Sequence, residues 1–203
     1  MARKKSVDLE QTRLTLLETG LELFEQKGFN ATGIQEITDI AGVPKGSFYN
    51  YFISKEGFGV DVIRYYTEIH IERWKNLLAA EEGNSYLALS IVFTEIAARY
   101  EGANPKKGCL LGTLAAEISE ASDDCRVALS EAVRQFKEIL AQRLMLGQQT
   151  GKVRSDLSKD QLADLVWNCW QGSLLQMKID NSAEPVKKTL DVLFENILIP
   201  CPE

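Results

Sequence analysis

Residues 43–52 read Val-Pro-Lys-Gly-Ser-Phe-Tyr-Asn-Tyr-Phe, and this stretch decides the fold that the sequence predicts. Pro44 suits the first turn of a short helix, because proline lacks the N–H that has no partner at that position anyway. Gly46 has no side chain, so the backbone there can approach a second surface closely. A short polar and aromatic helix of this kind is typical of the second helix of a helix-turn-helix, which enters the major groove of DNA.

The segments before this stretch predict two further helices. The first runs from about Leu9 to Lys27 with one apolar face and stops at Gly28. Thr32 and Gln35 match a capping box for the second helix, in which each side chain bonds the backbone of the other. This second helix is expected to end near Ala41-Gly42 and to turn three isoleucines inward, at positions 34, 37 and 40.

The side chains expected to face DNA lie around the proposed second helix of the motif. Lysine can bind a guanine edge or a phosphate, whereas serine, threonine and tyrosine hydroxyls mostly bind phosphates. Phe48 and Phe52 are expected to be core anchors instead. Ser54 is expected to cap the next helix, whose free N–H groups would form a phosphate clamp with Lys55. The predicted DNA-binding residues are Thr32, Lys45, Gly46, Ser47, Tyr49, Asn50 and Lys55. The run Arg3-Lys4-Lys5 is either an arm in a neighbouring groove or a solvated tail.

From Ser54 onward helical periodicity continues through long segments, and no strand pattern interrupts it. The predicted fold is all-α with about nine helices. A three-helix helix-turn-helix domain is expected over 9–54, and a larger helical domain for effector sensing and dimerisation over 55–203. No apolar run is long enough to span a membrane, and no apolar stretch follows the basic N-terminus, so a cytoplasmic location is expected.

Charge and cysteine content narrow the possible partners. The net charge is −6, but residues 1–64 carry eight lysines and arginines against nine acidic residues, so a local basic patch can still attract phosphates. The four cysteines are widely spaced and form no metal-binding or redox signature. No cofactor and no metal are expected. His70 is the only histidine, and nothing pairs it with a nucleophile.

The pieces described so far, taken as a set, resemble the N-terminal domain of TetR-family regulators. The resemblance covers about residues 10–60 and includes Gly28-Phe29, Ala41-Gly42-Val43, residues 45–52 and Ser54-Lys55-Glu56. Asn50 differs, since histidine is frequent there in the family, but asparagine can also bond a phosphate. The resemblance implies a homodimer that binds double-stranded operator DNA and represses transcription until a small-molecule effector releases it.

Residues 106–111, Lys-Lys-Gly-Cys-Leu-Leu, are the most informative stretch of the second domain. Cations and a helix N-terminus both favour the reactive thiolate of a cysteine. The segment resembles a TetR subgroup that includes the repressor of N-ethylmaleimide reductase, which responds to electrophiles and oxidants. Cys109 is therefore a candidate sensor, and the resemblance implies that Lys178 lies near it. The alternative is that Cys109 is a small buried hydrophobic residue, as most free cysteines are.

A reversible apolar pocket without thiol chemistry is the competing effector site. It would be lined by large side chains at helical spacing, although such residues more often form core. The candidates are Trp74, Phe93, Tyr100, Trp167, Trp170 and Met177. The last two predicted helices form the expected dimer interface, because the eighth is apolar nearly all round and must be buried on more than one side. Its expected interface residues are Leu162, Leu165, Val166, Cys169, Leu174 and Met177, with Val186, Leu190, Leu193 and Ile197 on the ninth.

Two other functional classes fit the sequence less well. An enzyme would need paired catalytic groups or a phosphate loop, and none is recognisable. A helical adaptor with a vestigial DNA domain would not need Lys45, Tyr49 and Lys55. The sequence thus predicts a sequence-specific DNA-binding transcriptional regulator. We expect a repressor that is released from its operator by a small molecule or by electrophile modification of Cys109.

Overall fold

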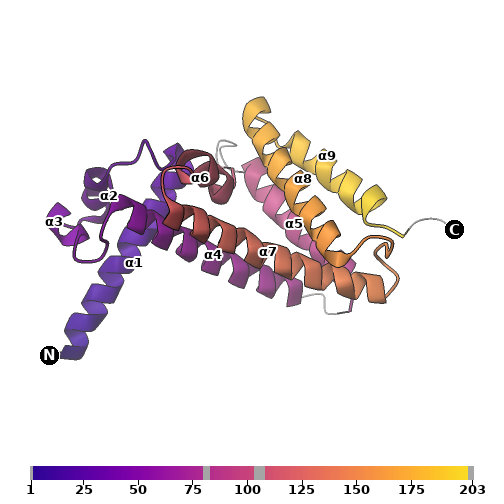
Figure 1. Ribbon diagram of the computed structural model, residues 1–203, viewed down its shortest axis with the longest axis horizontal. Helices are drawn as coiled ribbons and strands as arrows, with labels where there is room; N and C mark the ends of the chain where they lie inside the picture. Colours follow the sequence, from indigo (N-terminus) through magenta and orange to yellow (C-terminus); the bar gives the residue numbers. More distant parts are fainter. Residues whose placement is uncertain (1, 80–82, 103–107, 201–203) are drawn as a thin grey trace. The chain divides into compact units, whose positions relative to one another are not determined.

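The computed structural model describes residues 2–79, 83–102 and 108–200, except for the side chains of 2–8 and 101–102. Over these residues, helices are the only regular secondary structure (Figure 1). The helices are α1 (Ala2–Lys27), α2 (Ile34–Ala41), α3 (Lys45–Phe48), α4 (Lys55–Ala79), α5 (Ser85–Gly102), α6 (Leu110–Ile118), α7 (Asp123–Gln149), α8 (Lys159–Asp180) and α9 (Glu184–Val192), followed by a π-helical turn, η1 (Leu193–Ile197). None of the described helices is long and apolar enough to cross a membrane. The all-α prediction is confirmed.

Most helix bounds agree with the sequence prediction because local signals set them. Ser158 caps α8: its hydroxyl accepts from the Gln161 N–H at 3.2 Å, and the Gln161 side chain accepts from the Ser158 N–H at 3.0 Å. Ser54 caps α4 by accepting from the Gly57 N–H at 3.0 Å. The main difference is α1, which begins at Ala2 and not near Leu9. The backbone of Arg3-Lys4-Lys5 is therefore helical, while their side chains lie outside the described part of the structure.

By packing, the chain divides into two compact units that interleave in sequence. The first holds residues 1–68 and 110–132, and the second holds residues 69–109 and 133–203. The first unit thus contains α6 and the start of α4 and α7, besides the three N-terminal helices. The predicted domains, 9–54 and 55–203, stay a prediction about how the sequence is organised.

The core of the first unit is built around one aromatic side chain, Phe58 of α4. It is fully buried, and its ring centroid lies 4.7 Å from Phe52, 5.3 Å from Phe48 and 5.9 Å from Phe24. Aromatic pairs at such separations contribute beyond their buried area when their rings are tilted or edge-on, as these are. The prediction that Phe48 and Phe52 anchor α3 in the core is confirmed, since they are 0% and 3% exposed.

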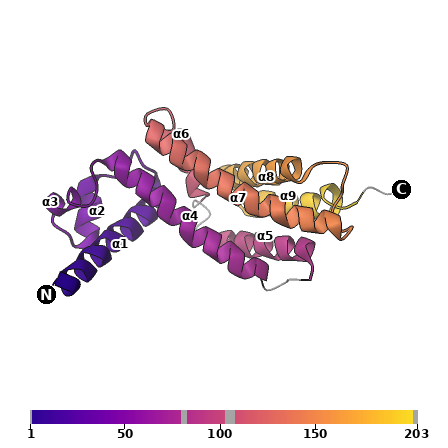
Figure 2. The ribbon, with the colours of Figure 1, turned by 60° about the horizontal axis from the view of Figure 1, so that its bottom comes forward.

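The second unit is a bundle in which α8 packs along α9 in both views (Figures 1 and 2). Its core is a chain of ring contacts. Trp74 lies 5.6 Å from Phe93, which in turn lies 5.1 Å from Trp170. Next to this series of ring contacts, the Tyr86 hydroxyl of α5 donates to the backbone carbonyl of Phe194 in η1. The π-helical turn therefore supplies a carbonyl that joins α5 to the C-terminal end of the bundle.

Candidate DNA interface and effector site

The turn between α2 and α3 depends on Gly42. Gly42 has φ +67°, in the left-handed region that glycine adopts at helix ends without strain. Its N–H donates to the Asp39 carbonyl at 3.3 Å, and the Val43 N–H donates to the Thr38 carbonyl at 2.9 Å. These bonds satisfy the last carbonyls of α2 and reverse the chain within three residues. The predicted tight turn of a helix-turn-helix is therefore present.

The second helix of the motif is shorter than predicted but continues as hydrogen-bonded turns. Regular α3 ends at Phe48, whereas the prediction placed its end near Tyr51. The Tyr51 and Phe52 N–H groups both donate to the Phe48 carbonyl, at 3.0 and 3.1 Å. The buried Phe48 and Phe52 side chains thus anchor the segment of residues 45–52 in the core, while its other residues are exposed or half-buried.

The exposed face of this segment carries most of the predicted DNA contacts. Lys45, Gly46 and Asn50 are exposed, and Ser47 is half-buried. Tyr49 is 55% exposed and lies edge-on to the Phe48 ring, with centroids 5.5 Å apart. A side chain added at Gly46 would meet no protein atom within 4 Å. The protein's own packing therefore does not require glycine there, in keeping with close approach to a DNA backbone.

Two predictions about the approach to α2 are wrong. The N-cap of α2 is Gly33, which makes no side-chain cap, so the Thr32–Gln35 capping box does not form. The Thr32 hydroxyl instead donates to the Gly28 carbonyl at 2.7 Å, and its side chain is buried. A phosphate contact by Thr32 stays a prediction without support in this geometry. Ile37 is buried as predicted, but Ile40 is 61% exposed because α2 buries only one narrow face.

The side chain of Lys55 is bound by other groups of the protein itself. Its ammonium donates to the Phe29 carbonyl at 2.7 Å and lies 4.2 Å from the centroid of the Phe29 ring. Burial lowers the pKa of Lys55, while the nearby carboxylates of Glu56 and Glu117 act in the opposite direction. Lys55 is thus a structural tie between α4 and the turn after α1. Its predicted contact with a phosphate remains a prediction.

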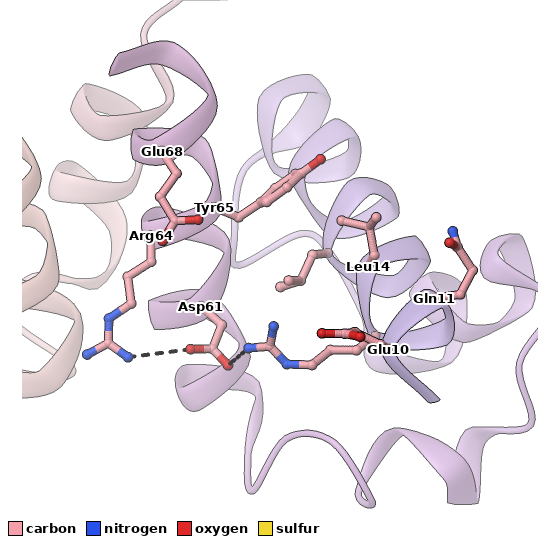
Figure 3. A pocket seen from close by; sticks show the side chains of 9 residues that line it. Glu10, Gln11, Leu14, Asp61, Arg64, Tyr65 and Glu68 are labelled. Atoms are coloured by element: carbon pink, nitrogen blue, oxygen red, sulfur yellow. Dashed lines mark hydrogen bonds and ion pairs between the residues drawn. The ribbon is translucent and has the colours of Figure 1, made fainter. Parts of the chain in front are cut away.

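A cleft of about 640 Å³ lies between α1 and α4, entirely within the first unit (Figure 3). Asp61 of α4 joins Arg13 of α1 at 2.7 Å and Arg64 at 3.5 Å along one side of it. Leu14 and Leu17 of α1 supply apolar lining. Sequence reasoning had no signal for this cleft, because ordinary charged residues on two separate helices form it.

The structure brings Lys178 to the residue beside Cys109. A Cβ added at Gly108 would lie 2.3 Å from Lys178 Cε and 3.1 Å from Lys178 Nζ. The lysine side chain therefore occupies the space that any larger residue at 108 would need. Cys109 is buried, and α6 begins at the next residue, as predicted. The two lysines at 106 and 107 lie outside the described residues.

The residues predicted to line an apolar pocket form part of the aromatic core. Trp74, Phe93, Trp167, Trp170 and Met177 are all buried. The Phe93 ring contacts those of Trp74 and Trp170, and three aromatic residues that the prediction missed extend this cluster. The Tyr100 ring is also within 6.4 Å of the Trp170 ring. The missed residues are Tyr86, Phe136 and Phe194. A ligand pocket at this place stays a prediction.

His70 and the metal-binding groups complete the set of candidate chemical sites. Burial, with a smaller effect of Arg99, lowers the pKa of His70 to about 4, so its ring is neutral near pH 7. Among the described residues, no cluster of three or more histidine, cysteine or carboxylate side chains is placed to hold a metal ion.

The arrangement that stands out is a helix-turn-helix whose exposed polar segment rests on the buried aromatic side chains around Phe58. This geometry defines a DNA-binding protein of the helix-turn-helix class.

Comparison with known proteins identifies the family. The family model of bacterial regulatory proteins of the tetR family matches residues 16–58. The model of the tetracyclin repressor-like C-terminal domain matches residues 88–193. The chain belongs to the TetR family. It is a helix-turn-helix transcriptional repressor that binds DNA, and members of this family are not enzymes.

Individual relatives cover nearly the whole chain. The transcriptional repressor DhaR of Mycobacterium sp. strain GP1 is 36% identical over 92% of this chain and 92% of its own. The repressor NemR of Escherichia coli K12 is 36% identical over 88% of this chain and 90% of its own. The crystal structure of E. coli NemR in its reduced form superposes with a TM-score of 0.83 at 34% identity, covering 92% of this chain and 97% of that one.

Proposed function

We propose that this repressor binds a two-fold symmetric operator as a homodimer and is released when an electrophile modifies Cys109. The observation that carries the effector part is the side chain of Lys178, which crosses Gly108 next to Cys109. The nucleophilic form of a cysteine is its thiolate, so a cysteine that reacts with electrophiles must lose its proton. The similarity to NemR, whose solved structure is described as its reduced form, supports a thiol in the mechanism.

The proposed modification is a conjugate addition to an electron-poor alkene, such as N-ethylmaleimide. The Cys109 thiolate forms a carbon–sulfur bond with one alkene carbon, and the alkene π electrons move to give an enolate. A proton from water, or from the Lys178 ammonium, then converts the enolate to the saturated adduct. Cys109 is buried, so the adduct must displace its neighbours. Modification therefore favours a state of the protein that differs from the one that binds DNA.

The test of the effector mechanism uses DNA from the region upstream of the protein's own gene. Fluorescence anisotropy would measure operator affinity before and after treatment with N-ethylmaleimide. We expect release of the wild type, no release of Cys109→Ser, and slower release of Lys178→Met. Cys201→Ser is the control, because it removes a thiol elsewhere in the sequence and leaves Cys109 in place. Equal release of Cys109→Ser and wild type would remove Cys109 from the mechanism.

The DNA-contact part is tested on the same fragment. Replacing one phosphate-binding side chain should weaken binding and lower the slope of log affinity against log salt by about one. We expect this behaviour from Lys45→Ala, and a loss of affinity from Tyr49→Phe if the hydroxyl binds a phosphate. Glu22→Ala is a control on an exposed face of α1. Operator binding by Lys45→Ala equal to wild type at every salt concentration would contradict the assignment.

The proposed homodimer interface follows an exposed stripe on α8. Leu165, Leu175 and Ile179 are 38%, 62% and 68% exposed, and Gly172 between them is also exposed. Their spacings of seven, three and four residues place them on one helix face, as in a two-helix seam. Leu162, Val166, Leu174 and Met177 were expected at the interface, but they are buried within the chain itself. The apolar outer stripe is what remains available for a partner.

The dimer proposal predicts that a charge on this stripe separates the subunits. Leu175→Glu should give a monomer in analytical ultracentrifugation, and operator affinity should fall because the two half-sites are no longer bound together. Gln142→Glu is the control, since it adds the same charge at an exposed position of α7, away from the stripe on α8. A dimer of unchanged stability in Leu175→Glu would place the interface elsewhere.

A reversible ligand is a second candidate effector, and one observation favours it. Two buried side-chain nitrogens, Arg73 Nε and Gln171 Nε2, have no hydrogen-bond partner. Arg73 directly precedes Trp74 of the aromatic core, and Gln171 directly follows Trp170. Buried polar atoms without a partner are costly, and a bound polar group would relieve that cost. Release of Cys109→Ser from the operator by a non-electrophilic aromatic compound, abolished by Gln171→Leu, would favour this mechanism.

A further inference from the structure

The turn between α1 and α2 is held by a carboxylate from a distant helix. The backbone N–H of Asn30 donates to Glu117 Oε2 at 2.8 Å. Glu117 lies in the last turn of α6, 87 residues further along the chain. A hydrogen bond from a backbone N–H to a carboxylate is charge-assisted and stronger than one between neutral groups. The contact therefore fixes the start of the segment that leads into the helix-turn-helix.

Gly28 shows that the carboxylate fills a space prepared for it. A Cβ added at Gly28 would lie 2.0 Å from Glu117 Oε1 and 2.8 Å from Glu117 Cδ. Gly28 also has φ +83°, a backbone conformation that other residues rarely adopt. The turn thus leaves one side open, and the Glu117 side chain packs directly against the bare backbone there.

Lys55 holds the residue between these two contacts from the other side. Its ammonium donates to the Phe29 carbonyl at 2.7 Å and lies over the Phe29 ring. Glu117 and Lys55 also attract each other, since Glu117 favours the charged form of the lysine. Three consecutive residues, 28 to 30, are therefore fixed by one side chain from α6 and one from α4.

Helix α6 connects the Glu117 contact to the residue that directly follows Cys109 in the sequence. The helix has nine residues and begins at Leu110, directly after Cys109. Leu110, Leu114 and Ile118 are buried, so α6 is a short rigid rod whose two ends are both packed. A displacement of its first residue is passed to Glu117 through the helix itself, because a packed helix does not deform easily.

We propose that Glu117 is a positioning residue for operator binding: it ties the turn at residues 28–30 to α6, so that operator affinity depends on where α6 lies. When Glu117 binds the turn, α2 and α3 are held in the arrangement that fits DNA. When α6 moves, the turn loses its carboxylate and the binding-competent arrangement becomes less populated, which weakens apparent affinity in proportion. The second consequence, release on Cys109 modification, rests on the function proposed above.

The first test measures operator affinity without any electrophile. Glu117→Ala removes the acceptor, Glu117→Gln keeps an oxygen that can accept from Asn30, and Glu120→Ala is the matched control. Glu120 is exposed and lies three residues from Glu117, and Glu120→Ala removes the same charge as Glu117→Ala. Loss of one charge-assisted hydrogen bond corresponds to about ten-fold in an equilibrium constant. We expect about that loss for Glu117→Ala, a smaller one for Glu117→Gln, and none for Glu120→Ala.

Amide hydrogen exchange at Asn30 reports the contact directly and does not depend on DNA. The Asn30 amide should exchange faster in Glu117→Ala than in wild type, while amides in the centre of α1 keep their protection. This comparison separates a local loss of the turn from general destabilisation, even if Glu117→Ala melts at a lower temperature. Wild-type protection of Asn30 in Glu117→Ala, or operator affinity equal to that of Glu120→Ala, would overturn the proposal.

A second measurement tests coupling to the effector. The ratio of operator affinity before and after N-ethylmaleimide should shrink in Glu117→Ala, because part of the change has already occurred. A merely destabilised protein would keep the wild-type ratio, and that result would overturn the coupling. If wild type itself is not released by N-ethylmaleimide, the Cys109 proposal fails. The affinity and exchange measurements would then still decide the role of Glu117.

Discussion

Two glycine-to-alanine substitutions in the first unit should separate stability from DNA binding. Gly20→Ala should lower the free energy of unfolding, whereas Gly46→Ala should lower operator affinity and leave stability almost unchanged. Gly20 lies in α1 against the central Phe58, and a methyl group added there would lie 2.2 Å from Phe58 Cζ and 2.5 Å from Cε1. Phe58 is fully buried among Phe24, Phe48 and Phe52, so its ring has no free space to move into. The added methyl must therefore displace the aromatic base of α3.

The magnitude follows from two opposing contributions. Alanine in a helix interior is favoured over glycine by roughly 1 kcal/mol. Overpacking a dense core costs roughly 1–3 kcal/mol, and a contact near 2.2 Å with a fixed ring belongs at or above the upper end. We expect Gly20→Ala to lower the free energy of unfolding by about 2 kcal/mol net. For a chain of this length the melting temperature should fall by about 4–8 °C.

Gly46→Ala provides the contrast, because an added methyl there meets nothing within 4 Å. Its melting temperature should stay the same or rise slightly, while operator affinity falls by about ten-fold or more, equivalent to about 1.4 kcal/mol. Thermal melts followed by circular dichroism and operator titrations by anisotropy would measure both quantities. The double substitution Gly20→Ala with Phe58→Leu should regain part of the stability, since leucine leaves room for the methyl. Wild-type melting of Gly20→Ala would refute the packing argument, and wild-type operator affinity of Gly46→Ala would refute the close approach to DNA.

Three further predictions concern stability. Because the pKa of His70 in the folded protein is lowered to about 4, the unfolded chain binds more protons than the folded protein below about pH 6.5. The neutral His70 ring therefore does not lower the free energy of unfolding above that pH, and stability is lost as the pH falls toward 4. Between about pH 7.5 and 5, urea unfolding should show His70→Gln losing about 2 kcal/mol less than wild type, and parallel pH profiles would contradict this. Ser158→Ala should cost about 1 kcal/mol in the same assay, since it breaks the capping box of α8, with the exposed Ser155→Ala as comparison. Gly42→Ala should cost about 1 kcal/mol through its left-handed conformation, and unchanged stability would mean that the turn relaxes.

Local signals accounted for most of the fold. The bounds of α7 and α8 follow from serine caps and apolar periodicity, which act within a few residues of the chain. The same reasoning failed at Thr32, where the local pattern fits a capping box. The hydroxyl bonds the Gly28 carbonyl instead, because the turn exposes that carbonyl to a side chain four residues later. A motif match does not show which of two nearby partners a hydroxyl will choose.

The sequence by itself determined the helical architecture, the helix-turn-helix and the aromatic anchors of the segment at residues 43–52. These depend on periodicity, turn residues and caps, whose physics is confined to neighbours along the chain. Only the tertiary structure decided which distant groups meet. It placed Lys55 on the Phe29 carbonyl and Glu117 against the backbone of Gly28. Such contacts depend on how whole helices pack, and a carboxylate 87 residues from its partner leaves no local trace in the sequence.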